Sequence, residues 1–108
     1  MLELELATAL FKDALLETKV YGEYIRAKQM LKQDETLWSS LQEYRRKKYE
    51  MQQVMEGEEM YSRLETFERE EKRLREDERI ACFLDAELAL CRMMQEIFYS
   101  LVESLDFE

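Results

Sequence analysis

The sequence almost lacks the residues from which tight turns are built. Its 108 residues include two glycines, no proline and no asparagine. A β-rich fold needs such residues at the turns between its short strands. Hydrophobic residues make up 46% of the chain, which is too apolar a composition for a disordered acidic segment. The sequence therefore predicts an all-α helical bundle, and its length predicts a single domain over residues 1–108.

Five helical segments follow from the 3.6-residue periodicity of apolar side chains and from capping signals. Thr18, Asp34 and Asp77 each stand directly before an amphipathic run and are predicted N-caps. The first two helices are predicted at about 3–17 and 19–33, and the third from Asp34 to about Glu56. The fourth carries the apolar series that begins at Met60, and the fifth covers about 78–105.

The third and fourth helices are predicted to form a long antiparallel hairpin with its tip near Gly57. Two apolar series with heptad spacing flank this glycine: Leu37, Leu41, Tyr44, Lys48, Met51 and Met55 precede it, and Met60, Leu64, Phe67, Glu71 and Leu74 follow it. When the two series are paired across the hairpin, the residue numbers of each facing pair add up to the same value, as antiparallel pairing requires. We predict a left-handed C′ conformation for Gly57. Lys48 and Glu71 are predicted structural polar residues, which either pair with each other or extend past the aromatic rings.

The fifth helix is apolar on more than one face. One stripe contains Ile80, Leu84, Cys91, Met94, Phe98, Leu101 and Leu105, and a second set contains Phe83, Leu90, Met93, Ile97 and Val102. A helix of this kind is central to a bundle or shared with another subunit. We therefore predict a homo-oligomer whose interface includes Leu6, Leu10, Cys91, Met94, Phe98, Leu101 and Leu105.

Glu87 interrupts the first stripe of the fifth helix with a carboxylate. A buried carboxylate needs a partner or a raised pKa. We predict that Glu87 forms a salt bridge to an arginine or lysine of another helix and serves as a structural latch. The alternative is that Glu87 belongs to a functional contact surface.

The residue types present argue against an enzyme. The chain has no histidine, which removes Ser-His-Asp and Cys-His catalysis, and its two glycines form no phosphate-binding loop. Adjacent carboxylates such as Glu70 and Glu71 point about 100° apart on a helix and do not converge. Cys82 and Cys91 lie on opposite faces of one helix, and we predict buried structural thiols, with a redox or intersubunit role as the alternative. No cofactor or metal is expected.

The charge pattern limits the partners that the chain can have. The formal net charge is −9, and the excess of acidic residues lies in the two end regions. The basic run 45–48 and the stretch 69–79 are interleaved with or adjacent to acidic residues, which predicts solvated helix faces and no direct nucleic-acid contact. The acidic N-terminus resembles no signal peptide, and no apolar run is long enough to span a membrane. These features predict a cytoplasmic protein that binds itself and another protein.

Two groups of residues resemble the YlbF/YmcA (YheA-like) family of small helical proteins from Firmicutes. The first group is Ala7, Leu10, Leu15, Thr18, Tyr21, Tyr24, Ala27, Leu31, Asp34, Leu41, Tyr44, Arg45 and Gln52, and the second is the block from Phe83 to Leu88. Together they cover nearly the whole chain. They are helix-packing patterns and contain no catalytic signature.

The resemblance implies an oligomeric helical regulator without enzymatic activity. Better-known relatives assemble with one another, engage the endoribonuclease RNase Y, and affect mRNA processing, biofilm formation, competence and sporulation. Some carry cysteines linked to iron–sulfur clusters, including a cysteine-containing tail, whereas Cys82 and Cys91 lie within the fifth predicted helix. Two alternative functions are a chaperone-like or structural helical oligomer and a redox protein with a thiol or metal site.

Overall fold

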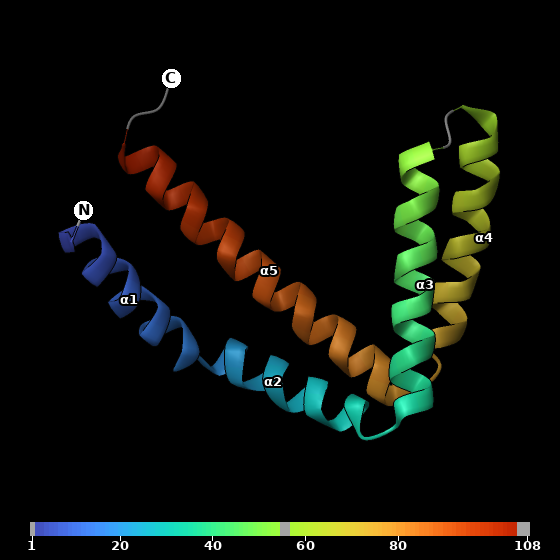
Figure 1. The fold of residues 1–108 in the computed structure, drawn as a ribbon, viewed down its shortest axis with the longest axis horizontal. Helices are drawn as coiled ribbons and strands as arrows, with labels where there is room; N and C mark the ends of the chain where they lie inside the picture. Colours follow the sequence, from blue (N-terminus) through green and yellow to red (C-terminus); the bar gives the residue numbers. More distant parts are fainter. Residues whose placement is uncertain (1, 55–56, 106–108) are drawn as a thin grey trace.

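Five helices make up the computed structural model of the protein, which describes residues 2–54 and 57–105 (Figure 1). They are α1 (Leu2–Leu16), α2 (Lys19–Lys32), α3 (Glu35–Val54), α4 (Glu58–Leu74) and α5 (Glu78–Ser104). No strand occurs within the described ranges. The all-α prediction is confirmed, and the first, second and fifth helices begin and end within one residue of the predicted positions. The predicted end of the third helix near Glu56 lies outside the described residues. Met55, the last residue of the apolar heptad series that precedes Gly57, lies outside the described residues.

The three predicted N-caps are confirmed by their hydrogen bonds. The backbone N–H of Tyr21 donates to Thr18 Oγ1 at 3.1 Å, and the N–H of Leu37 donates to Asp34 Oδ1 at 3.1 Å. At α5 the N–H of Arg79 donates to Asp77 Oδ1 at 2.9 Å. Each side chain satisfies a donor that lacks a partner within the first turn of its helix, which fixes where α2, α3 and α5 begin.

Gly57 directly precedes α4 in a conformation that differs from the predicted one. Its φ of 74° lies in the region that favours glycine, as expected, but its ψ of −144° is extended rather than helical. The left-handed C′ prediction is therefore wrong. This combination of φ and ψ is accessible essentially to glycine alone, which explains why a glycine is needed between α3 and α4.

The helices form a V in which the α3–α4 hairpin is one side and the other three helices are the second (Figure 1). We call α1, α2 and α5 the arm. Within the arm, α5 packs mainly against α2. Within the hairpin, α3 packs against α4. The two sides meet where α2 ends and α5 begins, a region that we call the vertex. The antiparallel hairpin and the long C-terminal helix are both as predicted.

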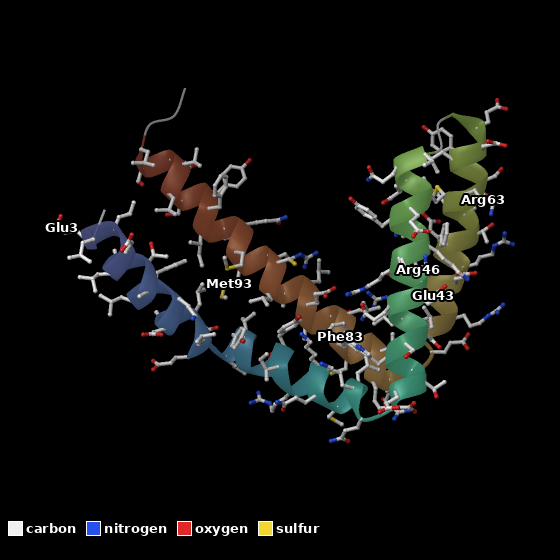
Figure 2. The ribbon with its side chains drawn as sticks, in the orientation of Figure 1. Glu3, Glu43, Arg46, Arg63, Phe83 and Met93 are labelled. Atoms are coloured by element: carbon white, nitrogen blue, oxygen red, sulfur yellow. The ribbon has the colours of Figure 1, made fainter. Side chains whose placement is uncertain are left out.

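Most of the core lies at the vertex and along the hairpin. The buried residues are Ala27, Leu31, Leu41, Tyr44, Met51, Phe67, Ile80, Phe83 and Leu84. Phe83 is only 1% exposed and joins the two sides of the V (Figure 2). Its ring contacts Tyr24 of α2 and Trp38 of α3, with centroid separations of 5.7 Å in both cases. Aromatic packing therefore holds the vertex together.

A single copy of the chain is far from compact. Its radius of gyration is 17.9 Å, whereas a compact domain of this length has a value of about 13 Å. Its accessible surface is 8988 Å², which exceeds by about 2,600 Å² the value typical of a monomeric protein of the same mass. The excess arises because the V is open and the far end of the arm has few neighbours.

Candidate interaction surface

A cleft lies on the inside of the V, between the hairpin and α5. It has a volume of about 430 Å³ and we call it the inner cleft. Both apolar and charged side chains line it. They are Leu41, Tyr44, Arg45, Lys48, Tyr49, Gln52, Glu71, Arg75, Leu84, Glu87, Leu88 and Cys91. Residues predicted as structural polar groups, Lys48, Glu71 and Glu87, are thus brought to one site by the fold.

Glu87 forms an ion pair across the inner cleft with Arg45 of α3. Arg45 Nη1 donates to Glu87 Oε2 at 3.1 Å, and Nη2 donates to Oε1, so that the pairing is bidentate. The guanidinium carbon of Arg45 also lies 5.4 Å from the ring centroid of Phe83. Both charged side chains are about one-third exposed. This contact bridges α3 and α5, and we expect it to fix the opening of the V, because a planar guanidinium in this position is held on two sides.

Lys48 and Glu71 both line the inner cleft but form no ion pair with each other among the described residues. Lys48 Nζ lies 5.9 Å from the ring centroid of Tyr44, as expected for a lysine that extends past an aromatic ring. Lys48 and Glu71 are half-buried. Of the two arrangements predicted for these residues, the structure therefore has the second for Lys48.

The hydroxyl of Tyr44 is buried between α3 and α4. Its ring packs edge-on against Phe67 with a centroid separation of 5.8 Å, and its oxygen has no hydrogen-bond partner among the described residues. Burial raises the pKa of the Tyr44 hydroxyl, and the carboxylates of Glu71, Glu70 and Glu68 raise this pKa further. The folded state therefore disfavours the ionised form of the Tyr44 hydroxyl.

We expect Tyr44→Phe to leave stability at pH 7 within about 1 kcal/mol of the parent value or to increase it, because the substitution removes a buried hydroxyl without a partner. In the parent the folded state has the higher pKa, so it binds more protons than the unfolded state above pH 10. Stability therefore falls as pH rises there. The variant should lose less stability between pH 9 and pH 11 in urea unfolding. Tyr61→Phe, at a tyrosine that is 73% exposed, is the control. Equal alkaline slopes for Tyr44→Phe and the parent would contradict this account.

The far end of the arm exposes a broad apolar surface. On α1 the exposed side chains include Leu6 and Leu10, at 59% and 70%. On α5 the exposed apolar residues beyond the inner cleft are Met94, Phe98, Tyr99, Leu101 and Leu105, at 40–71%. Most residues of the second set on α5 are half-buried, and Met93 lies on the side that faces α1 and α2 (Figure 2). The predicted interface residues of α5 thus point away from the chain's own core.

The structure does not bring the two parts of the predicted interface into one packed layer. α1 contacts α2 next to their junction and has little or no contact with α5. No residue of α1 is buried. Leu6 and Leu10 on α1, and Phe98 and Leu101 on α5, are therefore available for contacts outside the chain, but their role as an interface stays a prediction.

Both cysteines are exposed, so the predicted burial of Cys82 and Cys91 is wrong for the single chain. Cys91 lines the open inner cleft and is exposed there, because no other helix packs over it. Cys82 lies on the opposite face, in a shallow depression next to Ala27, Met30, Glu78 and Arg79. The apolar pattern on α5 correctly indicated which face each thiol occupies, but it could not indicate where the neighbouring helices end.

The basic run 45–48 is largely neutralised within the hairpin. Arg46 donates to Glu43 and to Glu50, with nitrogen–oxygen distances of 2.6 Å and 2.8 Å, and the Arg46 and Glu43 side chains lie together on α3 (Figure 2). Lys47 approaches Glu43 at 3.8 Å. Arg46 holds the pKa of the Glu43 carboxyl below its ordinary value. These are the surface pairs that the interleaved charges predicted.

Sequence reasoning did not identify Arg45 as the partner of Glu87 or Trp38 as part of the vertex. In the sequence Arg45 is a member of a basic run and of the family-like pattern, and neither indicates a partner on α5. Arg45 directly follows Tyr44 of the apolar heptad series, and this position is compatible with contact to a third helix. Several other lysines and arginines also directly follow a residue of such a series. The choice among them depends on the angle between the hairpin and α5, which the sequence does not contain.

The described part of the chain shows no sign of a membrane span or a metal centre. No helix there has the length and apolar character needed to cross a membrane. Nor do three or more Cys, Asp or Glu side chains gather within residues 2–54 and 57–105 in an arrangement that could hold a metal ion.

Comparison with known proteins identifies the family. A family model described as "Control of competence regulator ComK, YlbF/YmcA" matches residues 4–106, which is nearly the whole chain. No curated protein and no solved structure gives a significant match. The match includes α2 to α5, all but the first two residues of α1, the inner cleft and the exposed face of α5. The chain belongs to the YlbF/YmcA family, and a regulatory role follows from the description of that family.

Proposed function

We propose that this protein is a non-enzymatic cytoplasmic regulator that acts by protein–protein contact, with further copies of itself and with another protein. The observation that carries the proposal is the exposed apolar surface on α1 and on α5 beyond residue 90. Large exposed apolar side chains gathered on a helix face mark sites of association. The family match supports the regulatory part of the proposal.

A second copy of the chain is the first occupant that we propose for this surface. The single chain exposes about 2,600 Å² more than a compact monomer of equal mass. Obligate homodimers bury about 2,000–5,000 Å² in total, counted over both subunits. Covering half of the excess on each copy therefore suffices for a stable dimer. The other protein then meets a surface of the assembled oligomer, and family resemblance points to RNase Y as the partner to test.

The test measures the mass of the full chain in solution and its binding to RNase Y. We expect multi-angle light scattering at micromolar concentration to give at least twice the mass of one chain. Phe98→Glu, which places a charge in the exposed stripe of α5, should shift this mass towards that of a monomer. Tyr61→Glu is the matched control, because Tyr61 is also an exposed aromatic residue but lies on α4. Its mass should equal that of the parent.

The outcomes separate the functional classes. A monomer mass for the parent would contradict self-assembly. An oligomer that fails to bind purified RNase Y in a pull-down would exclude this partner. Strong binding of a hydrophobic dye to the native oligomer would favour the chaperone-like alternative, because a regulator with covered interfaces should bind little. A colour or an iron content in the purified protein that is lost on replacing Cys82 and Cys91 by alanine would favour the thiol- or metal-linked alternative.

A further inference from the structure

We propose that two copies pair through antiparallel α5 helices, with Cys91 opposite Leu101 and Met94 opposite Phe98, so that the end of each α5 closes the inner cleft of the other copy. This inference rests on the self-assembly proposed above and specifies its geometry. The second copy thereby contributes a wall to a site that is open in a single chain.

The first observation is that one heptad series runs along the whole of α5. Its positions are Ile80, Leu84, Glu87, Cys91, Met94, Phe98, Leu101 and Leu105, spaced alternately by four and three residues with a constant phase. Within the chain the first three face the hairpin: Ile80 and Leu84 are buried, and Glu87 binds Arg45. The last five are exposed. The series therefore continues beyond the hairpin as a packing surface without a neighbour.

The hairpin excludes a parallel arrangement of two α5 helices on this surface. In a parallel pair, residues 80–87 of the second copy would lie opposite residues 80–87 of the first. That side of α5 is already occupied by the hairpin, as the burial of Leu84 and the Arg45–Glu87 ion pair demonstrate. An antiparallel pair avoids this overlap, because the two hairpins then lie at opposite ends. It also satisfies twofold symmetry, in which each contact between two residues occurs twice.

Helix length selects one antiparallel register. In an antiparallel pair of heptad helices, each a position lies opposite a d position of the other helix. The sum of the two facing residue numbers defines the register, and the allowed sums differ by seven. An index sum of 192 places Cys91 opposite Leu101 and Met94 opposite Phe98. A sum of 185 would drive Leu101 against the buried Leu84. A sum of 199 would leave Cys91 with no facing residue in α5, which ends at Ser104.

The same register brings Leu105 of the second copy opposite Glu87, at the inner cleft. The cleft wall there includes the side chains of Leu84 and Leu88, and Leu88 is 46% exposed in a single chain. Because Glu87 is already paired with Arg45, an apolar residue can cover it without leaving a charge unpartnered. The e and g positions beside the exposed residues of this heptad series border the contact between two helices and carry no charge; they are Leu88, Leu90, Gln95, Ile97, Val102 and Ser104. The α5 surfaces that meet are therefore apolar or neutral apart from Glu87, whose charge Arg45 balances.

Cross-linking through cysteine tests the register directly, and one reporter is native. In a Cys82→Ser background, Cys91 of two antiparallel copies should be separated by ten residues along the axis, about 15 Å. This exceeds the Cα separation of about 7 Å that a disulfide allows. The background protein should therefore not cross-link on mild oxidation or with a short bismaleimide. Adding Leu101→Cys should give nearly complete dimer on a denaturing, non-reducing gel.

A matched control and a second pair complete the design. Tyr99→Cys in the same background places a thiol at a 71% exposed position on another face of α5, and should cross-link at least tenfold less than Leu101→Cys. Met94→Cys with Phe98→Cys, in a chain lacking Cys82 and Cys91, tests the second predicted layer if the first variant does not fold. Light scattering of each variant before cross-linking confirms its assembly.

Each result has one meaning. Cross-linking of Cys91 to itself in the background protein would overturn the antiparallel arrangement. A dimer in which both designed pairs cross-link no better than Tyr99→Cys would overturn the register, while the proposed self-assembly would stand. A monomer in light scattering would contradict self-assembly itself and the register with it.

Discussion

Phe83→Ala is expected to lower the free energy of unfolding by about 3–5 kcal/mol, the range found when a buried phenylalanine is truncated. Phe83 is 1% exposed and its ring meets Tyr24 of α2 and Trp38 of α3. Removing it leaves a cavity where three helices join and also takes the aromatic face from Arg45. Small domains have total stabilities of about 5–15 kcal/mol, so this loss is a large fraction. Urea unfolding followed by circular dichroism measures it.

Phe98→Ala is the matched control because it is the same substitution on the same helix. Phe98 is 65% exposed in the single chain, so its truncation should act mainly through assembly. The stability of an oligomer rises with protein concentration, and that of a monomer does not. Phe83→Ala should therefore destabilise equally at low and high protein concentration, whereas the effect of Phe98→Ala should grow with concentration. Effects of equal size and equal concentration dependence would contradict the assignment of Phe83 to the core and Phe98 to the interface.

Removal of either partner of the Arg45–Glu87 ion pair is expected to lower the free energy of unfolding by about 1–3 kcal/mol. Arg45→Ala leaves the Glu87 carboxylate half-buried without its two donors, and Glu87→Ala leaves the guanidinium over Phe83 without an anion. A double-mutant cycle in urea should give a coupling of about 1–2 kcal/mol, because the geometry is bidentate and partly desolvated.

The exposed pair Arg46–Glu43 on α3 supplies the comparison for this cycle. This pair also consists of an arginine and a glutamate, but both of its side chains are about half exposed. Exposed pairs of this kind contribute about 0.2–1 kcal/mol. Arg45→Lys should retain the charge but lose the paired donors, and should recover less than half of the coupling. A coupling for Arg45–Glu87 no larger than for Arg46–Glu43 would mean that the ion pair does not fix the opening of the V.

Local patterns predicted the helices well because each helix end has its own chemical cause. Thr18, Asp34 and Asp77 were identified as N-caps from their position before amphipathic runs, and all three form the expected hydrogen bonds. Gly57 was identified from the change of heptad phase around it. Its ψ was predicted wrongly, because the phase change locates a turn without specifying its backbone conformation.

The candidate site was predicted less completely because it depends on angles between helices. The exposed stripe of α5 was recognised from its heptad spacing, but its apolar character alone does not distinguish a surface from a core. Cys91 was expected to be buried for this reason. The structure places it in the wall of the open inner cleft, where no helix packs over that face of α5. Similarly, Arg45 becomes the partner of Glu87 only because α3 crosses α5 at the vertex.

The sequence by itself determined the helical class, the number and ends of the helices and the antiparallel hairpin. These properties follow from contacts between residues close in the chain: caps, turns and apolar spacing within one helix. Only the tertiary structure decided that the V is open, that α1 and the far half of α5 are left without neighbours, and that Arg45 and Glu87 meet. Those features depend on which faces of distant helices pack together at the vertex, and a periodic pattern does not specify its own partner.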